Sequence, residues 1–121
     1  CAVSAAAIQN HRIEHARSLA TRLSAHVVLK GAATVMADPD GSVFVNSSGN
    51  SGMASGGMGD VLTGAIAGFV TQGFAPKEAI HLGVYLHGAA ADNLWQHKGP
   101  FGYLATEVMN QLPNQIRNLV P

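Results

Sequence analysis

Hydrophobic and polar positions recur along the chain with two different periods, and these periods predict helices and strands. Apolar residues between positions 8 and 23 recur at helical spacing, which predicts one amphipathic helix with the face Ile8, Ile13, Ala16, Leu19, Ala20 and Leu23. The run His26–Lys30, "HVVLK", is apolar at its three inner positions. We therefore predict a parallel strand that is buried on both faces and needs neighbours on both sides.

Two short alternating runs follow, "TVMAD" and "SVFVN", and Asp38-Pro39-Asp40-Gly41 separates their apolar parts. Proline and glycine around an aspartate are typical of a turn, so these runs predict a β-hairpin. Further along, we expect a helix over Val61–Gln72 that is stopped by Gly73.

The last third of the chain predicts two more helices. One begins at Pro76, which suits a first helical turn, and ends at about Trp95 or Gln96. Gly99-Pro100 breaks the chain, and the other helix covers Tyr103–Leu119, with Pro113 as a candidate interruption. The order helix, strand, hairpin, glycine loop and three helices predicts part of a layered α/β/α domain.

Composition narrows the class of protein. Only 12% of the 121 residues are charged, against about 25% in a typical domain, which favours much buried surface in a larger domain or an oligomer. The net charge is zero, and no basic stripe points to nucleic acid. The apolar run Val61–Val70 is too short to span a membrane.

The single cysteine, Cys1, excludes an internal disulfide and fits a reducing compartment such as the cytoplasm. Because Cys1 is no initiator and the strand near position 28 lacks neighbours, we expect residues 1–121 to be the C-terminal part of one larger α/β domain.

Seven of the 14 glycines lie between Gly49 and Gly68, and the segment "NSGMASGGMGD" runs directly into the helix predicted from Val61. Glycines before a helix N-terminus let phosphate oxygens approach the unpaired amides of its first turn. The segment therefore predicts an anion site. It is not a Walker sequence, because no Gly-Lys-Ser/Thr follows.

Asp60 ends this segment, and two interpretations of it stay open. An aspartate at a helix start is commonly a cap. Alternatively, its carboxylate accepts the proton of a substrate hydroxyl that attacks a phosphoryl group. We favour the second, because a carboxylate beside an anion site otherwise repels phosphate.

Other residues have plainer explanations. Gly64 and Gly68 suggest close packing of a helix on a sheet, and Met53 and Met58 suggest gap-filling under the loop. Trp95 and Tyr103 could stack on adenine, but a core or interface role is the alternative we favour. "HRIEH" at 11–15 matches a zinc-binding pattern, for which a solvated helix face is the simpler account.

The glycine segment and its surroundings resemble a known family. "GNSGMASGGMGDVLTG", "LHGAAADNL" and "GYLATEVMNQLP" are similar to the C-terminal half of the ADP/ATP-dependent NAD(P)H-hydrate dehydratases. This family belongs to the ribokinase-like superfamily, so the resemblance implies the C-terminal portion of a ribokinase-like three-layer α/β/α fold. The family's Thr-Pro-His-Pro-Gly-Glu segment is expected before Cys1.

The resemblance implies nicotinamide nucleotide repair. Hydrated NADH or NADPH (NADHX or NADPHX) is phosphorylated on its new hydroxyl by ADP, or by ATP in other members, with magnesium present. Loss of phosphate then restores the cofactor. The resemblance further implies a homo-oligomer such as a tetramer, and an NAD(P)HX epimerase that is fused to the dehydratase or works with it.

The resemblance also assigns residues. It makes Asp60 the catalytic base and a substrate contact, and it gives Gly59 a contact with the nucleotide. The anion hole falls on Gly57, Met58 and Gly59, and the nucleotide wall falls on Lys30, Gly31, Ala32, Ala33 and Thr34. For Lys30 alone, a solvated strand end is the simpler account.

Two other functions stay open. A hydroxymethylpyrimidine or thiazole kinase of the same superfamily shares the Gly-x-Gly-Asp loop and stops at the phosphorylated product. A non-catalytic nucleotide-binding scaffold could also keep the loop.

Overall fold

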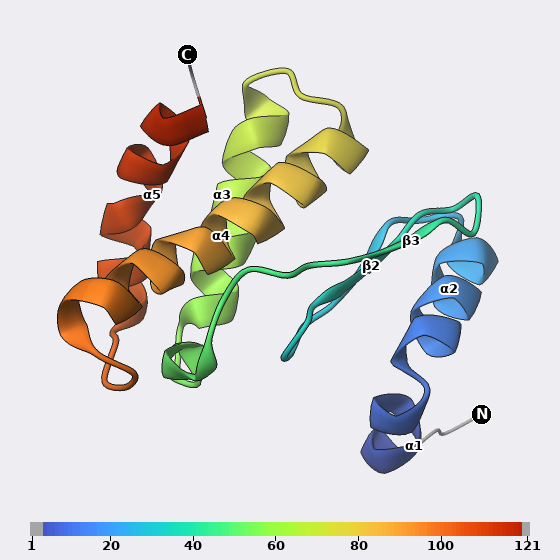
Figure 1. Ribbon diagram of the computed structural model, residues 1–121. Coiled ribbons are helices and arrows are strands. Elements are labelled where there is room, and N and C mark those ends of the chain that lie inside the picture. The colour runs from blue at the N-terminus through green and yellow to red at the C-terminus, as the bar shows by residue number, and fades with distance from the viewer. Residues whose placement is uncertain (1–3, 120–121) are drawn as a thin grey trace. The chain divides into compact units, whose positions relative to one another are not determined.

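A computed structural model describes residues 4–119 of the chain, so Cys1 lies outside the described residues. The chain divides into two compact units, the first ending at Asn46 and the second beginning at Ser47. Each unit has its own hydrophobic core and is described by itself. In Figure 1 the first unit runs from blue to cyan and the second from green to red. Whether residues 1–121 form part of one domain stays a prediction.

The first unit combines helices with a small sheet. Its elements are α1 (Ala5–Asn10), α2 (Arg12–Leu23), β1 (Val27–Leu29), β2 (Val35–Ala37) and β3 (Val43–Val45).

The prediction of a single helix over positions 8 to 23 is wrong, because the helical conformation is interrupted at His11. Here φ is −135° and ψ is 47°, and the N–H of His11 bonds to the carbonyl of Ile8, three residues back, at 3.3 Å. The first helix therefore closes in a tight turn, and the second starts anew at Arg12. Ser4 caps the first helix by accepting the N–H of Ala7 at 3.2 Å.

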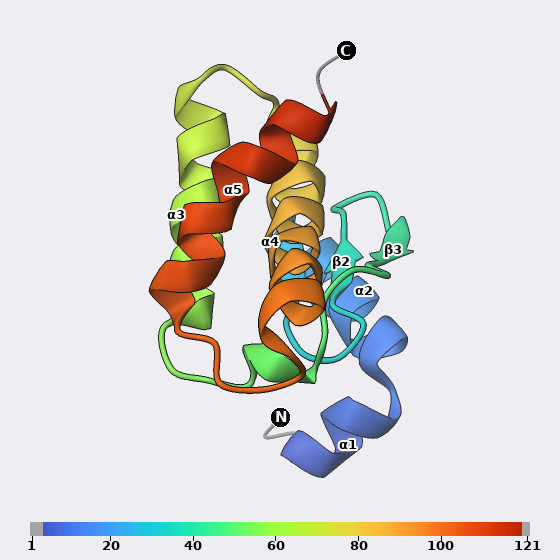
Figure 2. The same ribbon diagram turned by 60° about the vertical axis from the view of Figure 1, so that its left-hand side comes forward.

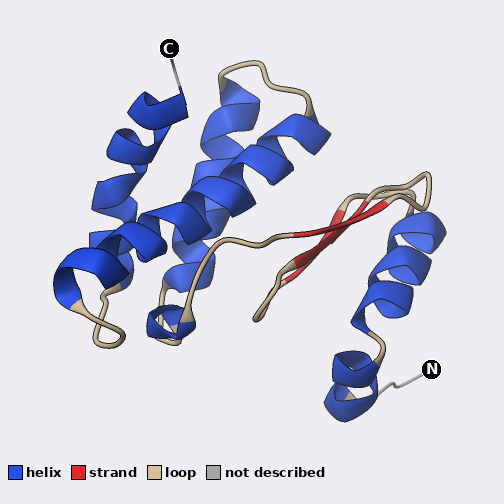
Figure 3. Cartoon of the chain, viewed as in Figure 1, coloured by secondary structure: helices blue, strands red, loops and turns tan. Residues whose placement is uncertain are grey.

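The strands, drawn in red in Figure 3, form a small sheet. They pair antiparallel in the order β1-β2-β3. The predicted hairpin is confirmed: Met36 pairs with Phe44, and the Asp38 N–H bonds to the Ser42 carbonyl at 2.9 Å. The predicted parallel pairing is wrong among the described strands, since β1 pairs antiparallel with β2. Its residues are half-buried within the first unit, and burial on both faces stays a prediction.

The core of the first unit lies between α2 and the sheet. Ala16 and Ala20 are buried with Val35 and Ala37, because alanine on one helix face lets the backbone approach the strands closely. The wider apolar face predicted for this helix is only partly buried: Ile13, Leu19 and Leu23 are 42%, 43% and 61% exposed.

The second unit is helical. It contains the short 3₁₀ helix η1 (Ser51–Met53), α3 (Met58–Thr71), α4 (Pro76–Lys98) and α5 (Ala105–Leu119). Figures 1 and 2 show the three α-helices side by side, and α4 packs against both of the others. The three predicted helices are present, although their bounds differ from the prediction. Helix α3 begins before Val61, and α5 continues through Pro113 without interruption. Pro113 is on the exposed side of the helix, where water can satisfy the carbonyl that it leaves unpaired.

The core of the second unit is built around Tyr103, which is 1% exposed and packs with Met58, Leu94 and Val108. Met53 packs against the same cluster, so the gap-filling role of both loop methionines is confirmed. The core role predicted for Tyr103 is also confirmed, whereas Trp95 is 44% exposed.

Two glycines of α4 allow neighbouring segments to approach the helix. A Cβ at Gly83 would lie 2.7 Å from Cγ1 of Ile66 on α3, and a Cβ at Gly88 would lie 2.6 Å from the backbone carbon of Ser48. At the glycines expected to pack closely, Gly64 and Gly68, such a Cβ would meet open space rather than a neighbouring segment of the second unit. Their packing against a sheet stays a prediction, since the described strands all belong to the first unit.

None of the helices in residues 4–119 combines the length and apolar character needed to cross a membrane.

We predict that Gly88→Ala lowers the free energy of unfolding by about 1–3 kcal/mol, because its methyl group meets backbone that cannot rotate away. Gly83→Ala, on the same helix, is the matched control and should cost less, since the Ile66 side chain can change rotamer. Urea denaturation of both variants checks the order. Equal costs would contradict the contact at Gly88.

Candidate functional site

Helix α3 begins on a glycine turn. Its N-cap residue, Gly57, has φ 84° and ψ −13°, in the left-handed region that a side chain disfavours. A Cβ at Gly57 would also lie 3.1 Å from Cβ of Ala105. The sequence places glycine here because both the backbone angle and the neighbouring loop require it.

The first turn of α3 presents unpaired amides beside a carboxylate. Met58 and Gly59 have no partner for their N–H groups inside the helix, and the structure gives the helix no side-chain cap. The Asp60 N–H bonds back to the Gly57 carbonyl at 3.1 Å, and the Asp60 side chain is exposed. These amides and the helix dipole favour an anion, so the start of α3 has the chemistry of an anion site.

The capping interpretation of Asp60 is wrong, because the N-cap is Gly57 and Asp60 is the third residue of the helix. Its carboxylate is therefore available to solvent and to a ligand. A carboxylate in this position can take a proton from a hydroxyl while the amides hold a charged group.

Lys30–Thr34 lie in the first unit, in the turn that joins β1 to β2. Lys30 is exposed, and the Thr34 hydroxyl donates to the Gly31 carbonyl at 3.1 Å. Arg12 of α2 orders this turn: its guanidinium donates to the Leu29 carbonyl at 2.8 Å and to the Ala32 carbonyl. The expectation that this turn follows a parallel strand is wrong among the described strands.

The predicted site residues therefore form two groups in two units. Gly57, Met58, Gly59 and Asp60 lie together at the start of α3. The other group, Lys30–Thr34, is one continuous turn.

The glycine segment is fastened to α4. The Gly49 N–H donates to Oδ2 of Asp92 at 2.8 Å, and the Asn50 amide donates to Oδ1 of Asp92 at 2.9 Å. Asn50 in turn accepts the Gly52 N–H at 3.0 Å and so caps η1. Sequence reasoning missed this pairing, because Asn50 and Asp92 are 42 positions apart and no local pattern shows that their two segments meet.

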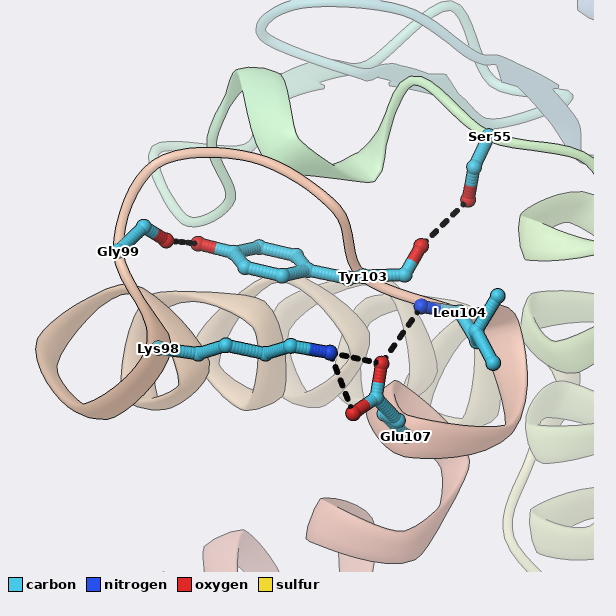
Figure 4. A network of polar contacts seen from close by, with 6 residues as sticks. All are labelled: Ser55, Lys98, Gly99, Tyr103, Leu104 and Glu107. Carbon is cyan, nitrogen blue, oxygen red and sulfur yellow. Dashed lines mark hydrogen bonds and ion pairs between the residues drawn. The ribbon is translucent and has the colours of Figure 1, made fainter.

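The other end of the segment is held by the loop before α5 (Figure 4). The Ser55 hydroxyl donates to the Tyr103 carbonyl at 3.0 Å, while the Tyr103 hydroxyl donates to the Gly99 carbonyl. Burial raises the pKa of the Tyr103 hydroxyl above its ordinary range, and the charge of Asp92 acts in the same direction.

Glu107 fixes the start of α5. Its carboxylate accepts the Leu104 N–H at 2.8 Å and pairs with Nζ of Lys98 at 2.7 Å, as Figure 4 shows. The Leu104 N–H, and after it the hydrogen bond from Lys98, lowers the pKa of Glu107. This network holds the loop that supports Ser55.

A polar cavity of about 350 Å³ lies elsewhere in the second unit. None of the sequence-predicted site residues lines it, and its lining consists of Ser47, Ser48, Tyr85, Ala89, Asp92, Asn93, Gln96 and Gln115.

The zinc pattern at 11–15 lies across a helix junction. His11 precedes the first residue of α2, and His15 lies within that helix. Within residues 4–119, no three histidine, cysteine, aspartate or glutamate side chains are grouped as a metal site requires.

Comparison with known proteins identifies relatives over nearly the whole chain. A family model described as NAD(P)H-hydrate dehydratase matches residues 1–114. The chain is 48% identical over 116 residues to the bifunctional NAD(P)H-hydrate repair enzyme Nnr of Moorella thermoacetica, covering 96% of this chain and 22% of that protein. It is 42% identical over 106 residues to the ADP-dependent (S)-NAD(P)H-hydrate dehydratase of Bacillus subtilis, covering 88% of this chain and 38% of that protein.

A solved structure is also similar. It is the crystal structure of the ADP/ATP-dependent NAD(P)H-hydrate dehydratase from Bacillus subtilis, co-crystallized with ATP/Mg²⁺ and soaked with CoA. The TM-score is 0.90 at 40% identity, over 96% of this chain and 43% of that chain. The predicted α/β fold class is thereby confirmed. The chain spans less than half the length of each of these relatives.

The lowered pKa of Glu107 predicts a pH-dependent contribution to stability. Its ionised form is favoured in the folded state, so the stabilisation is present above the ordinary glutamate pKa and is lost as pH falls through the lowered one. In Glu107→Gln we expect a lower free energy of unfolding at neutral pH and a smaller decrease on acidification. Urea denaturation from neutral to acid pH measures both.

Lys98→Met is the control for this prediction. This variant keeps the hydrogen bond from the Leu104 N–H to Glu107, which is the larger cause of the lowered pKa. Part of the decrease in the free energy of unfolding at acid pH should therefore remain. Identical pH profiles for the wild type and Glu107→Gln would contradict the assignment.

Proposed function

The chain belongs to the NAD(P)H-hydrate dehydratase family, and on this premise we propose that the complete protein is an ADP-dependent (S)-NAD(P)H-hydrate dehydratase. Its substrates are then NADHX and NADPHX, and its products are NADH and NADPH. The observation that carries the proposal is the exposed carboxylate of Asp60 in the first turn of α3, beside amides that lack helical partners.

In the proposed reaction, Asp60 is the base. Its carboxylate takes the proton of the hydroxyl on the hydrated nicotinamide ring as that oxygen attacks the terminal phosphoryl group of ADP, and AMP leaves. The phosphate ester then breaks at its carbon–oxygen bond. Phosphate leaves with that electron pair, a proton leaves the ring, and the double bond returns.

The backbone amides of the glycine turn act on the transferred group. Gly57, Met58 and Gly59 form the proposed anion hole, in which fixed N–H donors and the helix dipole stabilise the charge on the phosphoryl oxygens. Gly59 also contacts the nucleotide. Lys30, Gly31, Ala32, Ala33 and Thr34 form the proposed nucleotide wall, for which the exposed ammonium of Lys30 offers a positive charge to phosphate.

We expect magnesium to arrive with the nucleotide, because residues 4–119 contain no group of three histidine, cysteine, aspartate or glutamate side chains that could hold it alone. Asp60 is left as the base, and Mg²⁺ would be held mainly by the substrate phosphates and its own waters, as it commonly is at nucleotide sites. Such an ion would supply neutralisation of the phosphoryl charge.

We further propose a cytoplasmic homo-oligomer that acts together with an NAD(P)HX epimerase. The low charge content supports an oligomer, and the single cysteine supports a reducing compartment. The relative from Moorella thermoacetica is named as bifunctional, which supports a fused or cooperating second activity.

We predict that Asp60→Asn in the complete protein lowers turnover of (S)-NADHX by roughly two to four orders of magnitude, because the amide cannot accept the proton. ADP should still bind, since the backbone amides remain. The rise in near-ultraviolet absorbance of the restored NADH measures turnover, and calorimetry measures ADP binding.

Asp40→Asn is the matched control. Asp40 is also an exposed aspartate, and its side chain caps a turn of the first unit by accepting the Ser42 N–H at 2.8 Å, which an asparagine oxygen can also do. Its turnover should equal the wild type. Unchanged turnover in Asp60→Asn would contradict the assignment of the base. A phosphorylated product without restored NADH would indicate a kinase, and ADP binding without any product would indicate a scaffold.

A further inference from the structure

Asp92 lies on α4, far along the chain from the glycine turn, yet it makes two hydrogen bonds to the segment that leads into that turn. Oδ2 accepts the Gly49 N–H at 2.8 Å and Oδ1 accepts the Asn50 amide at 2.9 Å. Both oxygens of one carboxylate are thus used on consecutive residues. Charge-assisted bonds of this kind are stronger than neutral ones and fix direction as well as distance.

The hydrogen bond between Asp92 and Asn50 also affects the short helix η1, which follows Asn50. Because Asn50 donates to Asp92 through its amide nitrogen, its oxygen points to the Gly52 N–H, which it accepts at 3.0 Å. Asp92 therefore decides the orientation of the Asn50 amide, and that orientation caps η1.

The neighbours of Asp92 on α4 hold this residue, which we call the anchor, in a fixed position. Asp92 follows Ala90 and Ala91, which are fully buried in the helical core, so its backbone cannot shift without disturbing that core. Gly88, one turn earlier, lets Ser48 approach the same helix, and the Ser48 hydroxyl donates to the Tyr85 carbonyl at 2.9 Å.

The residues that follow Asn50 in the sequence, up to the start of α3, are held by contacts with Tyr103. A Cβ at Gly52 would lie 2.3 Å from the ring of Tyr103, and the Ser55 hydroxyl bonds to the Tyr103 carbonyl. Gly57 then starts the helix. The segment is thus held at Gly49, Asn50, Gly52 and Ser55 before it reaches the first turn of α3.

We infer that Asp92 is a positioning residue: it fixes the glycine segment through Gly49 and Asn50 and thereby sets where the first turn of α3 presents Asp60. The catalytic part of this inference rests on the proposed function, while the anchoring part does not.

The residue types at positions 50 and 92 can be swapped to test this inference. In Asp92→Asn, two amides face each other, so at least one of the three hydrogen bonds among Gly49, Asn50, Gly52 and position 92 is lost. The double variant Asp92→Asn/Asn50→Asp restores all three. The position-92 amide then accepts the Gly49 N–H and donates to the carboxylate at position 50, whose other oxygen accepts the Gly52 N–H.

We expect Asp92→Asn in the complete protein to lower kcat for (S)-NADHX by about ten- to a hundredfold, as a misplaced base does, with a smaller change in KM for ADP. The double variant should recover most of that kcat. Amide hydrogen exchange at Gly49 and Gly52 should become faster in Asp92→Asn and return toward wild type in the double variant. All measurements are made well below the melting temperature, where each variant is folded.

Glu78→Ala is the matched control on the same helix. It removes the carboxylate that accepts the Ala75 N–H at the start of α4, about 21 Å along the axis from Asp92, and should reduce stability with kcat unchanged.

The outcomes separate the two parts. If Asp92→Asn leaves exchange at Gly49 and Gly52 unchanged, or if the double variant fails to restore it, the anchoring is wrong. If exchange responds as expected but kcat does not, the positioning of Asp60 is wrong. If the wild type itself does not restore NADH, the proposed function fails, and the exchange data alone decide the anchoring.

Discussion

The start of α3 depends on a constraint of the peptide backbone: the first amides of a helix have no helical partner and need something else to bind. Most helices meet this need with a serine, threonine, asparagine or aspartate at the N-cap. Here the N-cap is Gly57, which has no side chain to offer. The amides stay available to a ligand, and the task of holding the turn in place falls on residues outside it, on α4 and on the loop before α5.

Local signals in the sequence predicted the elements whose geometry is set locally. The hairpin was predictable because Asp38-Pro39-Asp40-Gly41 dictates its turn, and α4 because Pro76 suits a first turn. The partner of β1 was not predictable, because an apolar run fits a strand in either direction. The break at His11 was missed because the apolar spacing continues across it.

The candidate site likewise has a part that was predictable from local sequence and a part that was not. Gly57–Asp60 could be predicted as a candidate anion site from the sequence, since glycines before a helix start expose backbone amides and the segment also agrees with a family motif. The support of that turn could not be found, because Asn50 and Asp92, or Ser55 and Tyr103, meet only after the helices have packed. The fold alone does not decide the chemistry, and the reaction must be argued from the site.

The contact between Gly52 and Tyr103 has a consequence for how the sequence can change over time. The phenol ring occupies the space where a side chain at position 52 would begin, since such a Cβ would lie 2.3 Å from it. A lineage that gains any side chain at position 52 must therefore accept a smaller residue at position 103, and with it lose a phenol that is bound to the Gly99 carbonyl. The two positions should vary together among relatives or remain fixed together.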